Sequence, residues 1–122
     1  MRWIVFIALS IAATLAEPAA AQSPEARAAE ARGRLLAERN CVMCHAVGRA
    51  DPSANPAAPP FRELNRRYDV EDLGEALAEG IITGHPAMPE HRFSPAEVND
   101  LIRYLRSIQT RETAWALPPS PR

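Results

Sequence analysis

Apolar side chains recur at helical spacing near the carboxyl end of the chain. Directly before them, residues 94–97 read Ser-Pro-Ala-Glu, a capping box with proline at the first helical position. Such a sequence starts a helix, and a spacing of three or four residues places the apolar side chains on one face. We therefore expect an amphipathic helix whose buried face carries five residues: Val98, Leu101, Ile102, Leu105 and Ile108.

An alanine-rich segment predicts another helix earlier in the chain, over residues 24–40. Ser23 is suited to cap this helix and Pro24 to open its first turn. Gly33 lies in the middle, where glycine costs about 1 kcal/mol relative to alanine. We therefore expect close packing against a second helix at this point. The inward side of the helix is expected to carry Ala28, Ala31, Leu35 and Leu36.

Two shorter helices are predicted between these segments. Residues 61–68 can form the first of them. The second follows Asp69, which can cap it, with Asp72 in the capping-box position, and it stops at Gly80. Its inward residues are expected to be Leu73 and Leu77.

The remaining segments are typical of loops. Residues 48–60 contain four prolines, and residues 81–93 contain Gly84, Pro86 and Pro89, all of which interrupt regular structure. No segment alternates apolar and polar residues over the length of a strand. The predicted fold class is therefore all-α.

The amino-terminal segment has the features of a bacterial export signal. After Arg2, residues 3–16 are uncharged and apolar, yet fewer than the about 20 residues that span a bilayer. Residues 19–21 are alanines and provide a small-residue cleavage site. We expect a signal peptide over residues 1–21, cleavage before Gln22, a periplasmic location and no stable membrane insertion of the mature chain. The alternative is an uncleaved N-terminus that anchors the protein to the membrane.

Composition narrows the class of the mature protein. The 122-residue chain has 14 basic and 15 acidic residues and a net charge of −1, which argues against a nucleic-acid binder. Its two cysteines cannot build a disulfide-rich scaffold. We expect one domain over residues 22–109, followed by a poorly ordered, proline-containing tail over residues 110–122. A bound cofactor would help so small a domain to build its core.

The spacing of Cys41, Cys44 and His45 is C-x-x-C-H, the attachment motif of c-type haem. Two thiols on one helical turn can bond the two vinyl groups of one haem, and the histidine then lies under the iron.

Other interpretations of the same motif are weaker. A thioredoxin-type motif would need a βαβ context, which is absent from the sequence pattern. A zinc site needs four ligands, of which His85 or His91 would be the last. A simple disulfide would leave the adjacent histidine unexplained. The motif therefore predicts one covalently attached haem c.

Four features in this order resemble a small class I cytochrome c with a single haem. They are Gly33, the C-x-x-C-H motif, the Met88-Pro89 pair and a last helix that contains Tyr104. The resemblance covers residues 26–108. It implies three to four helices around the haem, with the first and last helices crossing where the glycine meets the tyrosine.

The resemblance also implies residues around the haem. In that family a proline orients the proximal histidine, and Pro59 and Pro60 are the two candidates here, while Phe61 is expected in the haem wall. Met88 is the expected distal iron ligand; Met43 lies on the cysteine turn and cannot reach the opposite face. The candidate partners of the haem propionates are Arg62, Arg66, Arg67 and Arg92.

These expectations lead to a soluble periplasmic carrier of single electrons between respiratory or dehydrogenase partners. A methionine at the sixth iron position leaves no open site for a substrate, so we do not expect an enzyme. We expect a monomer whose partners are redox proteins. Two alternatives stay open. One is a dedicated haem c subunit of a periplasmic dehydrogenase complex, and the other is a five-coordinate gas-binding or sensor cytochrome.

Overall fold

The computed structural model describes residues 22–80 and 87–110. Within these ranges the chain is helical and contains no strand, so the all-α prediction is confirmed. In the described part of the chain, no helix is long and apolar enough to cross a membrane. The elements are α1 (Pro24–Asn40), η1 (Phe61–Arg66), η2 (Val70–Asp72), α2 (Leu73–Glu79) and α3 (Pro95–Ile108), where η marks a 3₁₀ helix.

Several predictions lie outside the described residues. They are the signal peptide with its cleavage site, the part of the second loop that holds His85, and the tail after Thr110. Thr110 itself was expected to begin the tail. Its N–H donates to the carbonyl oxygen of Arg62 at 2.9 Å.

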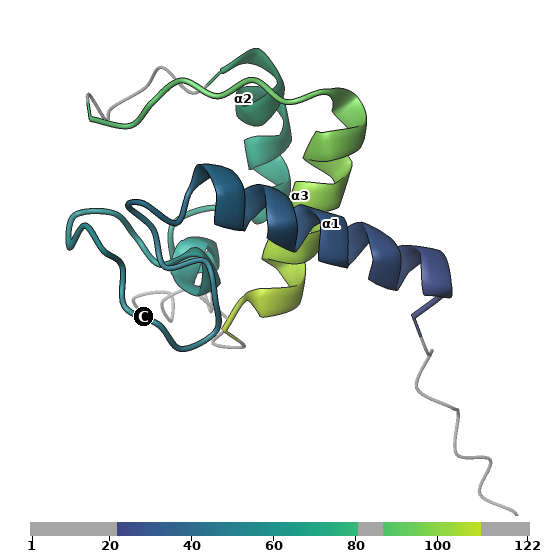
Figure 1. Cartoon of the computed structure of the whole chain (residues 1–122), viewed down its shortest axis with the longest axis horizontal. Helices are drawn as coiled ribbons and strands as arrows, with labels where there is room; N and C mark the ends of the chain where they lie inside the picture. Colours follow the sequence, from purple (N-terminus) through teal and green to yellow (C-terminus); the bar gives the residue numbers. More distant parts are fainter. Residues whose placement is uncertain (1–21, 81–86, 111–122) are drawn as a thin grey trace, which may run out of the picture.

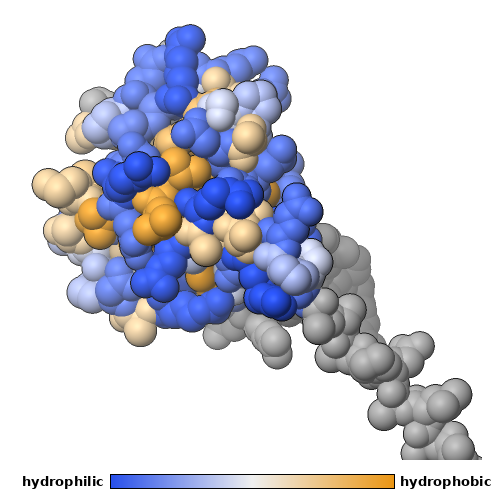
Figure 2. Space-filling view, turned by 45° about the vertical axis from the view of Figure 1, so that its right-hand side comes forward, coloured by the Kyte–Doolittle hydropathy of each residue, from blue (hydrophilic) through white to orange (hydrophobic). Residues whose placement is uncertain are grey.

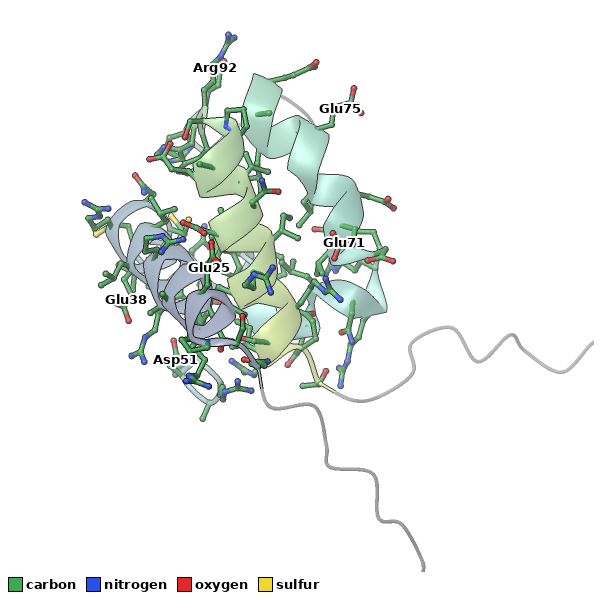
Figure 3. All side chains as sticks on the ribbon, turned by 90° about the vertical axis from the view of Figure 1, so that its right-hand side faces the viewer. Glu25, Glu38, Asp51, Glu71, Glu75 and Arg92 are labelled. Atoms are coloured by element: carbon green, nitrogen blue, oxygen red, sulfur yellow. The ribbon has the colours of Figure 1, made fainter. Side chains whose placement is uncertain are left out.

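The last helix, α3, lies at the centre of the fold. Helix α1 crosses it on one side and α2 packs against it on the other (Figures 1 and 3). All five apolar residues predicted for its inner face are buried, and Tyr104 is buried with them. Leu77 of α2 is buried and Leu73 is half-buried against the same core, as predicted. The amphipathic pattern of the sequence thus locates the central helix correctly.

Helices α1 and α3 pack closely at Gly33. A Cβ atom at this position would overlap the backbone carbonyl of Asp100 and lie 2.9 Å from the Cβ atom of Tyr104. The hydroxyl of Tyr104 donates to the carbonyl oxygen of Val47 at 2.6 Å, which ties α3 to the segment after the cysteine motif. The close packing predicted from the cost of glycine is therefore confirmed.

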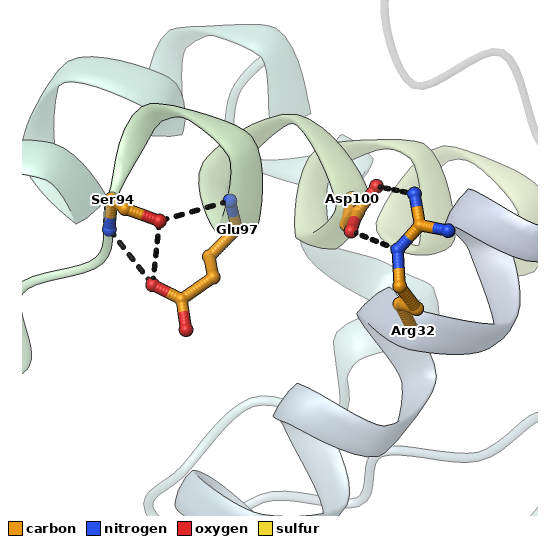
Figure 4. A network of polar contacts seen from close by, with 4 residues as sticks. All are labelled: Arg32, Ser94, Glu97 and Asp100. Carbon is orange, nitrogen blue, oxygen red and sulfur yellow. Dashed lines mark hydrogen bonds and ion pairs between the residues drawn. The ribbon is translucent and has the colours of Figure 1, made fainter.

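A bidentate ion pair lies beside this crossing. Nε and Nη2 of Arg32 donate to the two carboxylate oxygens of Asp100 at 2.7 and 2.9 Å (Figure 4). Because the arginine side chain is more than half exposed, solvent screens the pair, and its contribution to stability is small. The pair orients α1 on α3 more than it stabilises the contact.

Local capping defines the helix ends. Ser23 Oγ accepts from Ala26 N at 3.1 Å at the start of α1. At the start of α3, Ser94 N donates to the Glu97 carboxylate at 2.9 Å while Ser94 Oγ accepts from Glu97 N, which completes the predicted capping box (Figure 4). Helix α2 ends at Gly80, whose φ of 101° is in the range that favours glycine.

Two details of the sequence interpretation were wrong. The Asp69 side chain accepts from Glu71 N at 3.1 Å and caps η2, so the expected box with Asp72 is not formed. In α1, Leu36 is buried, but Leu35 is 55% exposed. Helix α3 crosses α1 at Gly33, and this crossing determines which face of α1 is buried against α3. The exposed residues expected to be inward are Ala28, Ala31 and Leu35, and the buried residues of α1 are Ala29, Gly33, Leu36 and Ala37.

Candidate functional site

The cysteine motif continues the last turn of α1. Cys41 N donates to the carbonyl oxygen of Ala37 at 2.9 Å, which extends the helical bonding pattern to the motif. Cys44 N and His45 N then both donate to the carbonyl oxygen of Cys41, at 3.1 and 2.9 Å. One turn of backbone therefore carries both thiols and the imidazole.

Both cysteines are free thiols, so the structure does not contain the disulfide alternative. Burial raises the pKa of the Cys41 thiol to about 11, which keeps it protonated at neutral pH. Among the residues that the structure describes, no group of three or more His, Cys, Asp or Glu side chains is arranged to hold a metal ion.

The imidazole of His45 has a specific backbone partner. Its Nδ1 lies 2.8 Å from the carbonyl oxygen of Pro59. An Nδ1–H that donates to this carbonyl leaves the lone pair on Nε2, which is the form of histidine that binds a metal. The sequence left Pro59 and Pro60 as equal candidates for this contact, and in the structure the carbonyl belongs to Pro59.

Phe61 forms a wall beside the same imidazole. Its ring centroid lies 4.9 Å from that of His45, with the ring planes at 38°. Its backbone N–H donates to the carbonyl oxygen of Ala46 at 2.9 Å, directly after the motif. The start of η1 is thus fixed to the motif by a backbone bond and a ring contact.

The segment that carries Met88 returns to α2 before α3 begins. The N–H of Phe93 donates to the carbonyl oxygen of Leu77 at 3.0 Å. The side chain of Glu90 lies so close to Gly80 that a Cβ atom there would be 2.6 Å from its carboxylate. Figure 1 shows residues 87–93 on the same side of the α1–α3 crossing as the cysteine motif.

Met88 itself is partly buried, and residues 87–93 are irregular, as predicted. Within residues 22–80 and 87–110, no hydrogen bond or ring contact given by the structure joins Met88 to the motif. Its place opposite His45 therefore stays a prediction. His91 stacks on Phe93, with ring centroids 6.0 Å apart.

Arg62 and Arg92, two of the four arginines proposed as propionate partners, already have protein partners, and a third, Arg66, lies 3.6 Å from the Glu63 carboxylate. Arg62 donates to the carbonyl oxygen of Asp51 at 2.8 Å, and its side chain is largely buried. Arg92 pairs with Glu90 at 2.8 Å and is exposed. These contacts make both side chains part of the protein's own framework.

Sequence reasoning missed Gln109. Its side-chain amide donates to the carbonyl oxygen of Phe61 at 2.8 Å, so it reaches the wall beside His45. The two residues are 48 positions apart, and a glutamine at the end of a helix has no periodicity or motif that marks it. Only the three-dimensional structure brings it to the site.

The described residues fit a covalently attached haem. Two free thiols lie on one turn with an imidazole whose Nδ1 is occupied by a carbonyl. Three partly buried residues, Cys41, Leu73 and Phe93, pack against the core. Figure 2 shows a patch of apolar residues on one face, surrounded by hydrophilic residues. The motif thus offers two thiols that could form thioether bonds and an imidazole that could bind the iron of a haem.

A comparison with protein-family models identifies the family. The model described as cytochrome c oxidase, cbb3-type, subunit III, matches residues 28–105, a range that runs from α1 to α3 and contains the C-x-x-C-H motif and Met88. Searches of curated proteins and of solved structures gave no match. The family match and the all-α fold agree with the class I resemblance of the sequence. The chain belongs to this family of c-type cytochrome domains.

Proposed function

We propose that this chain is a monohaem cytochrome c that carries single electrons between redox proteins in the periplasm. Membership of the family already implies haem-based electron transfer. The single observation that carries the finer proposal is the His45 imidazole, held at 2.8 Å by the Pro59 carbonyl beside two free thiols. One such motif in the sequence corresponds to one haem.

Each residue of the site has a separate task. Cys41 and Cys44 would hold the haem through thioether bonds, which would prevent its loss. The Nε2 atom of His45 would bind the iron, and the Pro59 carbonyl fixes the orientation of the imidazole ring and raises its basicity. Phe61 keeps water from this side of the imidazole. When bound, the haem supplies a reversible one-electron change at its iron.

The distal ligand decides between a carrier and a gas-binding protein. We assign this role to Met88, whose neutral thioether favours the reduced state and raises the potential. With Met88 as ligand, the iron would have no open position for a substrate or a gas. The function is therefore that of a carrier and not of an enzyme.

A second candidate is a haem c subunit that stays bound to a larger complex. The description of the matching family, which names a subunit of an oxidase, favours this candidate. A dehydrogenase complex would need the same kind of subunit. Purification from a mildly solubilised native source distinguishes the candidates, because a dedicated subunit co-purifies with its complex at any dilution and a carrier does not.

Export is part of the proposal. It is supported by the apolar residues 3–16 and the alanines at 19–21. Amino-terminal sequencing of the protein from its native source is expected to begin at Gln22. A membrane-bound product that retains residues 1–21 would establish the anchored form.

A spectrum and a carbon monoxide titration test the function itself. Purified protein is expected to show the spectrum of one covalent haem c per chain and a single reversible one-electron titration. Reduced protein is expected to give no rapid spectral change with carbon monoxide. Rapid binding would establish the five-coordinate alternative, and a protein without covalent haem would overturn the proposal altogether.

A further inference from the structure

The side chain of Gln109 uses all its polar groups to join α3 to η1. Its Nε2 donates to the carbonyl oxygens of Leu105 and Phe61 at 2.7 and 2.8 Å. Its Oε1 accepts from the backbone N–H of Asn65 at 2.9 Å. The first bond closes the end of α3, and the other two reach both ends of one short 3₁₀ helix.

Two further bonds support this junction. Thr110 N donates to the carbonyl oxygen of Arg62 at 2.9 Å, and Asn65 Nδ2 donates to the carbonyl oxygen of Thr110 at 2.8 Å. In Figure 1 the yellow end of α3 lies beside the teal turn of η1. These bonds therefore fasten η1 to α3, the central helix of the fold.

Phe61 connects this junction to the imidazole of His45. Its carbonyl is held by Gln109, its N–H by Ala46, and its ring lies 4.9 Å from the ring of His45. Pro59, whose carbonyl accepts from the imidazole, precedes it by two residues. A shift of the Phe61 backbone therefore moves both the ring that packs on His45 and the carbonyl that orients it.

We propose that Gln109 is a positioning residue that sets the orientation of His45 through Phe61. This inference rests on the proposed function, in which His45 is the iron ligand. Gln109 touches neither the imidazole nor the thiols in any contact that the structure gives. It acts by directing the carbonyl of Phe61, because a partly buried carbonyl without a donor is unfavourable and the start of η1 would shift to find one.

Two variants of different kinds test the proposal. Gln109→Leu keeps most of the side-chain volume and removes all three bonds. Gln109→Glu keeps an acceptor for Asn65 N but places a carboxylate against the carbonyl oxygens of Phe61 and Leu105. The matched control is Ser107→Ala, which removes a bond from Ser107 Oγ to the carbonyl of Tyr104 on the same helix end, without a path to Phe61.

The readouts are the low-temperature electron paramagnetic resonance of the ferric holoprotein and the exchange of the His45 Nδ1–H measured by NMR. Both Gln109 variants are expected to shift the g values, which depend on the orientation of the axial ligands. Both are also expected to speed the exchange by about tenfold, as local opening becomes easier. Ser107→Ala is expected to change neither quantity.

The outcomes separate this inference from the proposed function. A wild-type spectrum without low-spin, histidine-ligated iron would overturn the proposed function and this inference with it. If the wild type has histidine-ligated iron but both variants keep its g values and its exchange rate, the positioning role of Gln109 is overturned and the proposed function stands. Failure of both variants to yield holoprotein, with Ser107→Ala intact, would assign Gln109 to folding and also overturn the positioning role.

Discussion

Gly33 of α1 packs against Tyr104 of α3 so closely that a Cβ atom at position 33 would lie 2.9 Å from the Cβ atom of the tyrosine. On its other side the same atom would overlap the backbone carbonyl of Asp100. A backbone carbonyl in a helix cannot rotate away as a side chain can. The crossing of the two helices therefore depends on the absence of a side chain at position 33.

The first prediction compares two glycine substitutions. Gly33→Ala gains helix propensity but forces α1 and α3 apart, and overpacking costs about 1–3 kcal/mol. We expect a net loss of about 1–2 kcal/mol of unfolding free energy. The control is Gly74→Ala in α2, where the new Cβ meets only Val98 Cγ1 at 3.8 Å, an ordinary contact. Gly74→Ala is expected to stabilise the protein by up to about 1 kcal/mol. Thermal unfolding of both holoproteins would reveal opposite shifts, and equal shifts would contradict the prediction.

The second prediction concerns pH and the capping box of α3. Hydrogen bonds from the backbone and side chain of Ser94 lower the pKa of Glu97 below its usual value of 4.5. A carboxyl group whose pKa is lowered in the folded state stabilises the protein at pH values above its pKa in the unfolded chain. This stabilisation is lost as the pH falls through the pKa of the folded state.

A variant without the charge tests this effect. Glu97→Gln keeps an acceptor but cannot titrate. The difference in melting temperature between wild type and Glu97→Gln should therefore shrink below pH 4.5. A difference that stays constant down to pH 2 would show that the box is not charge-dependent.

The third prediction concerns haem attachment. Cys41→Ala and Cys44→Ala each leave at most one thioether, so little stable holoprotein is expected. The haem-free mature chain is expected to be largely unfolded, because its short helices then lack much of their core. The control, Val42→Ala, changes an exposed side chain between the two cysteines and should attach haem normally. Haem-stained gels and circular dichroism check both expectations. Cooperative folding of the haem-free chain would show that the helices do not need the cofactor.

The ends of the helices could be predicted from the sequence because capping is local. Ser23 and Ser94 lie directly before prolines and within three residues of the groups that they cap. Gly80 marks the end of α2 because a positive φ is strained for most other residues. The thiols and imidazole of the site could be predicted for the same reason, since five consecutive residues contain all three.

Where chemically equivalent neighbours compete for one distant contact, the sequence could not predict which of them makes it. The inner face of α1 was misassigned because Ala28 and Ala29 are chemically the same, and only the crossing decides which of them is covered. Pro59 and Pro60 are likewise identical in chemistry, and the path of the backbone selects the carbonyl that meets His45. Each of these choices is made by tertiary packing.

The distal ligand is the part of the site that most needs a direct experiment. Met88 lies in an irregular segment that returns to α2 through the bond from Phe93 N to Leu77, so a metal bond could hold it without disturbing a helix. Pro89 removes one backbone donor from the same segment. His91 lies three residues away and is partly buried, which makes it the described side chain best placed to replace the thioether.

The last prediction is therefore the effect of Met88→Ala. Loss of the neutral thioether removes a preference for the reduced state, so the potential is expected to fall. The iron then either stays open and binds carbon monoxide or takes a histidine, and Met88→Ala combined with His91→Ala should favour the open form. The control is Met43→Ala, which replaces a methionine that is 80% exposed on the cysteine turn and should leave the potential unchanged. A redox titration and the ferric sulfur-to-iron charge-transfer band measure both effects. If Met88→Ala leaves the potential and the band as in wild type, Met88 is not the ligand, and the proposed carrier function loses its main support.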